Sequence, residues 1–228
     1  MSLEVENLDA LHLKRRKGLS GVEQIDLWAV ESQCRQEGAL LVCGADEAGA
    51  GPLAGDVYAA AVVLPWGWVP EGLNDSKKLS PKVRDRLFDK IREKAVAWAV
   101  TSVDAATIDQ INILSARLLA MDRAIRALDP AADFALIDGN RDKGISCPHR
   151  TVVKGDSLSA NIAAASILAK VSRDRYMEEM ARQYPEYEFD HHKGYPTKRH
   201  YELLRRYGPC PIHRKSFLKK LYGEGEEL

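Results

Sequence analysis

The chain has 228 residues, of which 45% are apolar and 29% are charged, and its 33 basic and 33 acidic residues give a formal net charge of zero. These values are typical of one large globular domain, and they exclude a disordered tail protein, a collagen-like repeat and a coiled coil. The longest stretch without a charged residue, Val57 to Pro70, has 14 residues, fewer than the ~20 that a membrane-spanning helix needs.

The N-terminus and the cysteines both indicate a cytoplasmic protein. Glu4 and Glu6 stand where an export signal would be basic and then apolar. The four cysteines are scattered and form no CxxC pair. We therefore expect reduced thiols in a cytosol and no structural zinc.

The first half of the chain predicts an extension followed by strands. Residues 1 to 37 are highly charged and predict a peripheral helical extension. A short apolar run from 39 to 45 predicts a buried strand that ends at Asp46-Glu47, and residues 57 to 64 predict a second strand after a glycine-rich turn. Ser80 as N-cap and Pro81 at the first position predict a helix that continues to about Lys94.

The second half continues as alternating strands and helices. We expect a strand over 95–103, a polar turn, a helix over about 112–128, short strands over 134–137 and 151–153, and a long helix over 161–184. The last forty residues predict two or three short helices separated by Pro196, Gly208-Pro209 and Pro211. This order indicates an α/β fold with a mixed central sheet flanked by helices.

The C-terminal region carries an asymmetry that the net charge hides. From His191 to Gly223 there are nine lysines and arginines and a single acid, Glu202, with five aromatic residues interleaved. Such a segment attracts a phosphate backbone, although a basic helix face that balances acids elsewhere is an equal alternative. We expect a domain over 38–190 and a basic helical region over 191–228 that packs on it.

Acids follow three of the predicted strands. Asp46, with Glu47 beside it, Asp138 and Asp156 each stand where a strand ends. The carboxyl ends of neighbouring strands converge on one edge of an α/β sheet, where four acids would repel one another unless a cation neutralised them. With no histidine or cysteine at these ends, the ligands are oxygens, which suit Mg²⁺ or Mn²⁺. Each acid alone could instead be an N-cap or a turn residue.

Six sequence blocks resemble, in order, the motifs of bacterial ribonuclease HII. The resemblance runs from about residue 40 to Phe217. The blocks are Ala45-Asp46-Glu47-Ala48-Gly49-Ala50-Gly51-Pro52-Leu53-Ala54-Gly55, Leu73-Asn74-Asp75-Ser76-Lys77-Lys78-Leu79-Ser80, Leu136-Ile137-Asp138-Gly139-Asn140, Val153-Lys154-Gly155-Asp156, Ile162 to Lys170 with Ser172-Arg173-Asp174, and His192-Lys193-Gly194-Tyr195-Pro196-Thr197.

The resemblance implies a ribonuclease H-like fold and a metal-dependent endoribonuclease. It implies that Asp46, Glu47, Asp138 and Asp156 bind two divalent ions, Mn²⁺ or Mg²⁺, one for the attacking water and one for the leaving 3′ oxygen. The implied substrates are RNA/DNA hybrids and single ribonucleotides embedded in duplex DNA. Cleavage on the 5′ side of the ribonucleotide would leave a 5′-phosphate and a 3′-hydroxyl, which points to DNA replication and ribonucleotide excision repair.

The resemblance also implies substrate-binding residues. The loop Gly49-Ala50-Gly51 would read the ribose 2′-hydroxyl through its backbone. Tyr195 would pack on the adjoining sugar, and Lys77 and Lys78 would hold a phosphate. The family usually has arginine where this chain has Ala50, so one charged phosphate contact is lost unless another basic residue supplies it. We expect a monomer, since no exposed heptad or large apolar stripe is present.

Two alternatives belong to other classes. Gly155-Asp156-Ser157-Leu158 matches the opening of the GDSL esterase motif, which would make Ser157 a nucleophile, but no Asp-x-x-His follows it. A non-catalytic nucleic-acid-binding module would use the basic C-terminal region but leaves the four acids unexplained. Among further polar residues, Asp174 is explained by an ion pair with Arg173 or Arg175, and His191-His192 by a structural role or a phosphate contact.

Overall fold

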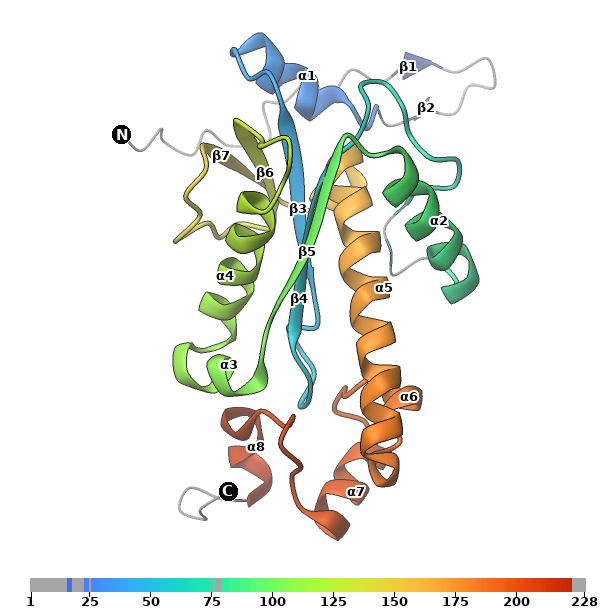
Figure 1. The fold of residues 1–228 in the computed structure, drawn as a ribbon, viewed down its shortest axis with the longest axis vertical. Helices are drawn as coiled ribbons and strands as arrows, with labels where there is room; N and C mark the ends of the chain where they lie inside the picture. The colour runs from blue at the N-terminus through green and yellow to red at the C-terminus, as the bar shows by residue number, and fades with distance from the viewer. Residues whose placement is uncertain (1–15, 18–22, 25, 75, 77–78, 223–228) are drawn as a thin grey trace.

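A five-stranded mixed sheet forms the centre of the molecule, with the strand order β5-β4-β3-β6-β7 (Figure 1). The computed structural model describes residues 16–17, 23–24, 26–74, 76 and 79–222. β4 pairs antiparallel with β3 and β5, whereas β6 pairs parallel with β3 and β7. The strands are β3 (Val42–Ala48), β4 (Val57–Val63), β5 (Ala97–Val103), β6 (Phe134–Asp138) and β7 (His149–Val152). The α/β prediction with a mixed sheet is confirmed.

Helices cover both faces of this sheet. α4 (Ile113–Arg126) packs on one face, and α5 (Ala160–Gln183) with α2 (Pro81–Lys94) packs on the other. β4 is buried on both sides because its alternate residues enter two different cores. Ala59 and Ala61 pack in the core that α4 closes, whereas Ala60 and Val62 pack in the core of α2 and α5.

The start of α5 packs unusually close to β3. Its first residues are mostly alanines, so little side chain separates the helix from the sheet. At Gly44 of β3 a Cβ atom would lie 2.2 Å from the backbone nitrogen of Ile162. Ser159 caps the helix by accepting a hydrogen bond from that same nitrogen. The glycine and the cap therefore fix where the first turn of α5 lies on the sheet.

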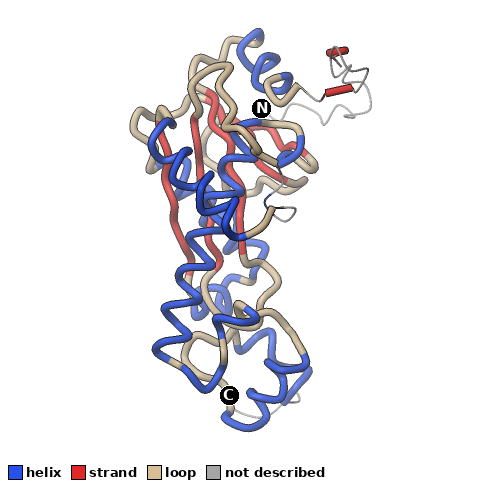
Figure 2. The backbone as a smooth tube through the Cα atoms, turned by 90° about the vertical axis from the view of Figure 1, so that its right-hand side faces the viewer, coloured by secondary structure: helices blue, strands red, loops and turns tan. Residues whose placement is uncertain are grey.

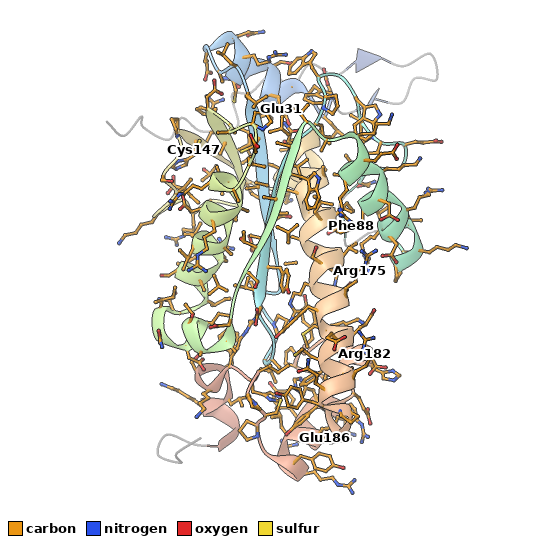
Figure 3. The ribbon with its side chains drawn as sticks, viewed as in Figure 1. Glu31, Phe88, Cys147, Arg175, Arg182 and Glu186 are labelled. Atoms are coloured by element: carbon orange, nitrogen blue, oxygen red, sulfur yellow. The ribbon has the colours of Figure 1, made fainter. Side chains whose placement is uncertain are left out.

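α2 begins as the sequence predicts. Ser80 accepts a hydrogen bond from Val83 N, and Pro81 is the first helical residue. The helix buries Phe88, whose ring lies 4.4 Å from the guanidinium carbon of Arg175 of α5. Figure 3 shows these two labelled side chains between α2 and α5. This contact joins the middle of α5 to α2.

The C-terminal helices lie beyond one end of the sheet (Figures 1 and 2). They are α6 (Phe189–His192), α7 (Lys198–Tyr207) and α8 (Lys215–Tyr222), and the 3₁₀ turn Pro185–Tyr187 joins α5 to α6. Phe189 and Leu203 pack with Met177 of α5 and with Ala54 of the loop after β3. The C-terminal region is thus packed against the sheet domain through α5 and that loop.

Two predicted elements of the central domain differ from the structure. β3 runs through Asp46 and Glu47 to Ala48 instead of ending before them, because β4 pairs with it along this stretch. The predicted polar turn before the helix at 112 is itself a helix, α3 (Ala105–Ile111), which Asp104 caps through Thr107 N.

The N-terminal prediction is right in part. The helical prediction for residues 1–37 is confirmed for α1 (Ala29–Gln36), but it is wrong for β1 (Arg16–Lys17) and β2 (Glu23–Gln24), which pair as a short ladder. The other residues of that extension before Asp26 lie outside the described part of the chain. No helix among the described residues is both long and apolar enough to cross a membrane.

Candidate active site

Parallel pairing brings two of the predicted acids to adjacent strands. β3 and β6 are neighbours, and Ala45 pairs with Ile137, so Asp46 and Asp138 follow side by side one residue later. Asp138 is the last residue of β6. Glu47 follows Asp46 along β3 and pairs with Ala59 of β4.

Asp156 reaches the same edge through a turn. β7 lies beside β6, and after it Lys154 adopts a left-handed conformation with φ of 58°. This turns the chain into a 3₁₀ turn over Gly155–Ser157, and the backbone N–H of Gly155 donates to Asp138 Oδ1 at 2.7 Å. The hydrogen bond holds the segment that carries Asp156 against the end of β6.

Glu47, Asp138 and Asp156 all lie close enough to Asp46 to act on its charge, and we call these four acids the carboxylate cluster. The Asp46 side chain is only 8% exposed. Burial raises the pKa of Asp46 well above its usual range, and the negative charges of Glu47, Asp138 and Asp156 raise it further. A cation at this edge would relieve the repulsion, and the oxygen-only ligand set suits a hard divalent ion.

Protein donors engage three of these carboxylates. Asp46 Oδ1 accepts from the backbone N–H of Glu47 at 2.7 Å, and Gly155 N donates to Asp138. Glu47 Oε1 accepts from Arg117 Nη1 at 3.0 Å. Within the described residues, no three His, Cys, Asp or Glu side chains already surround one point as metal ligands would. The chemistry of the cluster therefore fits divalent ions, with side-chain rotation needed to form the ligand shell.

The loop after β3, residues 49–56, contains Gly49-Ala50-Gly51, the segment predicted to recognise the ribose 2′-hydroxyl. A buried arginine is hydrogen-bonded to the backbone of this loop, which we call the glycine loop. Arg214, with a fully buried side chain, donates five hydrogen bonds of 2.7–3.1 Å to the carbonyl oxygens of Gly49, Ala50, Pro52 and Gly55. Burial, its largest influence, lowers the pKa of Arg214 to about 9. Its charge is thus spread over the carbonyl groups that set the loop's shape.

A second buried arginine holds the far side of the glycine loop. Arg173 of α5 donates to the carbonyl oxygens of Ala54, Asp56 and Lys193 at 3.0–3.1 Å. We refer to Arg173 and Arg214 together as the arginine clamp. The clamp joins α5, the glycine loop and the chain before Tyr195 into one unit.

Tyr195 lies beside the glycine loop. Its ring carbon Cε1 would be 3.9 Å from a Cβ atom at Gly51, and its ring centre is 5.8 Å from the Arg173 guanidinium carbon. The side chain is 40% exposed. An exposed aromatic ring and an open glycine backbone thus share one face, which suits contact with a ribose.

Buried histidines support Tyr195 from the C-terminal side. The Tyr195 carbonyl can only accept, so His200 carries a proton on Nδ1 at 3.0 Å from it. His200 Nε2 then accepts from His213 Nε2 at 3.0 Å, and His213 Nδ1 accepts from Cys210 N at 2.9 Å. His192 stacks on His200 with ring centres 4.3 Å apart. We call His192, His200 and His213 the histidine cluster; its members are structural rather than ligands of the carboxylate edge.

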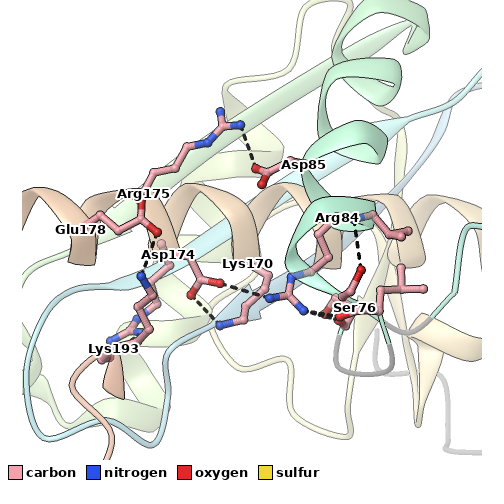
Figure 4. Close-up of polar contacts among 12 residues, drawn as sticks. Ser76, Arg84, Asp85, Lys170, Asp174, Arg175, Glu178 and Lys193 are labelled. Carbon is pink, nitrogen blue, oxygen red and sulfur yellow. Dashed lines mark hydrogen bonds and ion pairs between the residues drawn. The ribbon is translucent and has the colours of Figure 1, made fainter. Parts of the chain in front are cut away.

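Three further residues from the sequence analysis are Lys77, Lys78 and Asp174. Lys77 and Lys78 lie outside the described residues. Asp174 is in an ion pair, as expected, but its partners are Lys170 at 2.6 Å and Arg84 at 3.6 Å rather than the adjacent arginines (Figure 4). Arg84 also donates to the carbonyl oxygens of Ser76 and Leu79, so this ion pair connects these two residues to α5.

Neither GDSL-type chemistry nor a purely surface role for the basic residues fits the structure. The Ser157 hydroxyl donates to the Lys154 carbonyl at 2.8 Å, as a turn residue does. Arg214, counted within the basic C-terminal segment, is buried in the clamp and unavailable to phosphate, whereas Arg205 and Arg206 are exposed. Arg214 is therefore one basic residue of this segment to which neither alternative for the segment applies.

Sequence reasoning missed the residues that support the site. Arg117, His200 and His213 were given no role, while Arg173 was considered only as an ion-pair partner of Asp174 and Arg214 only as part of the basic segment. Four of them contact predicted residues, namely Glu47 for Arg117, Gly49 for Arg214, and Tyr195 for both Arg173 and His200, whereas His213 contacts His200. Apart from Glu47, the partner of Arg117, their hydrogen-bond partners are backbone groups or other missed residues, which carry no sequence signal. The single clue was Arg173 inside a motif block.

Comparison with known proteins identifies one family. The family model for ribonuclease HII matches residues 43–220. Ribonuclease HII of Caldicellulosiruptor bescii is 49% identical over 199 residues, covering 87% of this chain and 97% of the relative. Ribonuclease HII of Chlorobium luteolum is 56% identical over 191 residues, covering 81% and 92%.

Solved structures share the fold. Ribonuclease H2 from Pyrococcus horikoshii superimposes with a TM-score of 0.65 at 27% identity, over 78% of this chain and 93% of that one. Bst-RNase HIII, determined in complex with Mn²⁺, gives a TM-score of 0.58 at 21% identity, over 82% and 68% of the two chains. The ribonuclease H-like fold is confirmed.

Proposed function

Because this chain belongs to the ribonuclease HII family, we propose that its carboxylate cluster carries out the hydrolysis of that family. As a ribonuclease HII it is an endonuclease that acts on RNA/DNA hybrids and on ribonucleotides embedded in DNA. We infer that it cuts on the 5′ side of the ribonucleotide and leaves a 5′-phosphate and a 3′-hydroxyl. The single observation that supports the site is the parallel pairing of β3 and β6, which sets Asp46 beside Asp138, where Gly155 N holds the segment that carries Asp156.

The proposed metal set is two divalent ions, Mg²⁺ or Mn²⁺. The complex of Bst-RNase HIII with Mn²⁺ supports this choice, as does the oxygen-only ligand set here. When bound, two such ions supply activation of the attacking water and charge stabilisation at the leaving 3′ oxygen. Asp46, Glu47, Asp138 and Asp156 would hold them. The protein's own contribution is to fix Asp138 through Gly155 N and to bury Asp46, so that ligands and substrate meet in a set arrangement.

The proposed substrate reader is the exposed face of the glycine loop with Tyr195. The arginine clamp donates hydrogen bonds to carbonyl oxygens of the loop on its buried side, so the loop keeps its shape when a duplex approaches. Because Gly51 has no side chain, its backbone is accessible next to Tyr195, and a ribose can lie against both residues. This arrangement supports recognition of a 2′-hydroxyl by backbone and aromatic contact without a charged side chain at position 50.

The wider assignments follow the same reasoning. We propose that residues 38–190 form the catalytic domain, that 191–228 form a basic region packed on it, and that residues 1–37 are peripheral. We propose that the protein is a monomer and that it acts in the cytoplasm. Its proposed processes are DNA replication and the excision of ribonucleotides from DNA. Lys77 and Lys78 remain proposed phosphate contacts.

The test is cleavage of a labelled DNA duplex that carries one ribonucleotide, beside an all-DNA duplex, with Mg²⁺, Mn²⁺ or EDTA. We expect one cut on the 5′ side of the ribonucleotide, only with metal and only in the first duplex. Activity on long RNA/DNA hybrids without a cut here would locate a defect in the glycine loop and Tyr195. Binding without cleavage on every substrate would support a non-catalytic nucleic-acid-binding module instead.

A further inference from the structure

Arg117 is a cation at the carboxylate cluster that the proposed hydrolysis does not use. Its Nη1 lies 3.0 Å from Glu47 Oε1, and the two side chains are only 20% and 14% exposed. Its Nη2 is the atom nearest to a Cβ position on Gly139, at 3.8 Å. The guanidinium therefore lies between one proposed ligand, Glu47, and the turn that follows another, Asp138.

The position of Arg117 on α4 holds it there. Its neighbour Ala116 and the residue one turn on, Ala120, are fully buried against the sheet, which turns Arg117 to the edge of this buried stripe. The Arg117 Nε is buried and has no hydrogen-bond partner among the described residues. A guanidinium keeps its charge at every physiological pH, so this is a permanent positive charge in contact with Glu47.

We propose that Arg117 is a positioning residue that holds Glu47 in the ion-free protein and couples ion binding to nucleic-acid binding. The inference rests on the proposed function of Glu47 as a metal ligand. A divalent ion at Glu47 must share one carboxylate with the guanidinium, and two cations at one carboxylate repel each other. Arg117 therefore weakens ion binding while no nucleic acid is present.

A phosphate group removes this competition. The planar fork of arginine binds phosphate oxygens through two parallel hydrogen bonds, so a bound duplex can take the guanidinium from Glu47. Glu47 is then free for the ion, and each ligand raises the affinity for the other by the same factor. Arg117 in this way supplies a phosphate contact of the kind that Ala50 cannot make.

The experiment measures Mn²⁺ affinity by calorimetry or by electron paramagnetic resonance, on the full chain without nucleic acid. Arg117→Met keeps the length of the side chain and removes its charge, and Arg117→Lys keeps the charge and loses the fork. We expect Arg117→Met to bind Mn²⁺ about tenfold more tightly than the parent, a typical size for such coupling. Arg117→Lys should lie between the two.

The second measurement repeats the titration in the presence of an all-DNA duplex. The parent should gain Mn²⁺ affinity, and Arg117→Met should gain about tenfold less. Thermal unfolding of each variant checks that the fold is kept. Unchanged or weaker Mn²⁺ binding by folded Arg117→Met without the duplex, or an equal gain in Mn²⁺ affinity for both proteins when the duplex is added, would overturn the inference.

A matched variant separates this inference from the site assignment. Glu47→Gln should weaken Mn²⁺ binding if Glu47 is a ligand. A weakened Glu47→Gln with an unchanged Arg117→Met would overturn the role of Arg117 alone. If Glu47→Gln binds Mn²⁺ as the parent does, Glu47 is not a ligand, and both the assignment and the inference are wrong.

Discussion

The carboxylate cluster and the arginine clamp hold charge in opposite ways. In the cluster, burial raises the pKa of Asp46, and the like charges around it raise that pKa further. In the clamp, Arg214 spreads one positive charge over the carbonyl oxygens of the glycine loop, with five hydrogen bonds. The acids of the cluster repel one another, whereas the arginine of the clamp is hydrogen-bonded to the carbonyl groups around it.

This difference separates the chemistry from the recognition. A site that must accept ions has to keep ligands that repel one another, and its affinity then depends on what enters. A surface that must detect one hydroxyl group has to keep its shape before the substrate arrives. Loss of a carboxylate should therefore remove activity and spare the fold, while loss of a clamp contact should cost stability and substrate affinity together.

The largest expected effect is that of Asp138→Asn. The amide keeps the shape of the side chain and removes one ligand charge, and metal ions contribute several kcal/mol to such reactions. At tenfold for each 1.36 kcal/mol, we expect kcat to fall by about 10³-fold or more. Cleavage of the single-ribonucleotide duplex gives the rate, and urea unfolding should give a midpoint close to that of the parent. Cleavage at the parent rate would show that Asp138 holds no ion.

The next effect compares two glycines of one loop. At Gly49, with φ of 93°, a Cβ atom would lie 2.0 Å from Arg173 Nε, whereas at Gly51 it would lie 3.9 Å from the nearest atom, in Tyr195. We expect Gly49→Ala to destabilise the fold by about 1–3 kcal/mol and to raise KM. Gly51→Ala should stay within about 0.5 kcal/mol of the parent in stability and raise KM alone. Urea unfolding and cleavage kinetics measure the two quantities; equal stability losses would contradict this view of the clamp.

The histidine cluster predicts a pH dependence of stability. Burial, the largest influence, lowers the pKa of His200 to about 4 and that of His213 to about 3, below the ~6.5 of an unfolded histidine. The unfolded chain therefore binds more protons, and this stability is lost as the pH falls from about 6.5 towards 4. Each histidine should contribute a loss of about 2 kcal/mol by pH 5.

The control for this prediction is His200→Gln, because a second buried group acts the other way. Burial raises the pKa of Glu31 to about 7, so its protonation favours the folded state as the pH falls from there towards the unfolded value. The comparison is the change in urea midpoint between pH 7.5 and pH 5 for both proteins. His200→Gln should be less stable than the parent at pH 7.5 but lose less on acidification; an equal loss would assign the dependence to other groups.

The sequence predicted the cluster better than the clamp for a physical reason. Asp46 and Asp138 lie near the carboxyl ends of two strands that pair in parallel, so the topology brings together acids that the sequence pattern had already singled out. Arg214 acts on carbonyl groups more than 150 residues away in the chain, and carbonyls are the same in every residue. Its basic neighbours also suggested a phosphate contact, which its burial contradicts.

The smallest expected effect is that of Arg205, an exposed arginine of the basic region, in contrast to the buried Arg214. Arg205 projects to solvent from α7, within the basic region. If it contacts one phosphate, Arg205→Gln should reduce the slope of log K against log salt for duplex binding by about 0.9 and leave the urea midpoint unchanged. Titration of labelled duplex at four salt concentrations in EDTA measures the slope.

Arg214→Lys is the contrasting variant, because it should lower the urea midpoint and keep the slope. An unchanged slope for Arg205→Gln would limit nucleic-acid contact to the loop and Tyr195, and the basic charge of α7 would then serve only to balance acids on neighbouring elements.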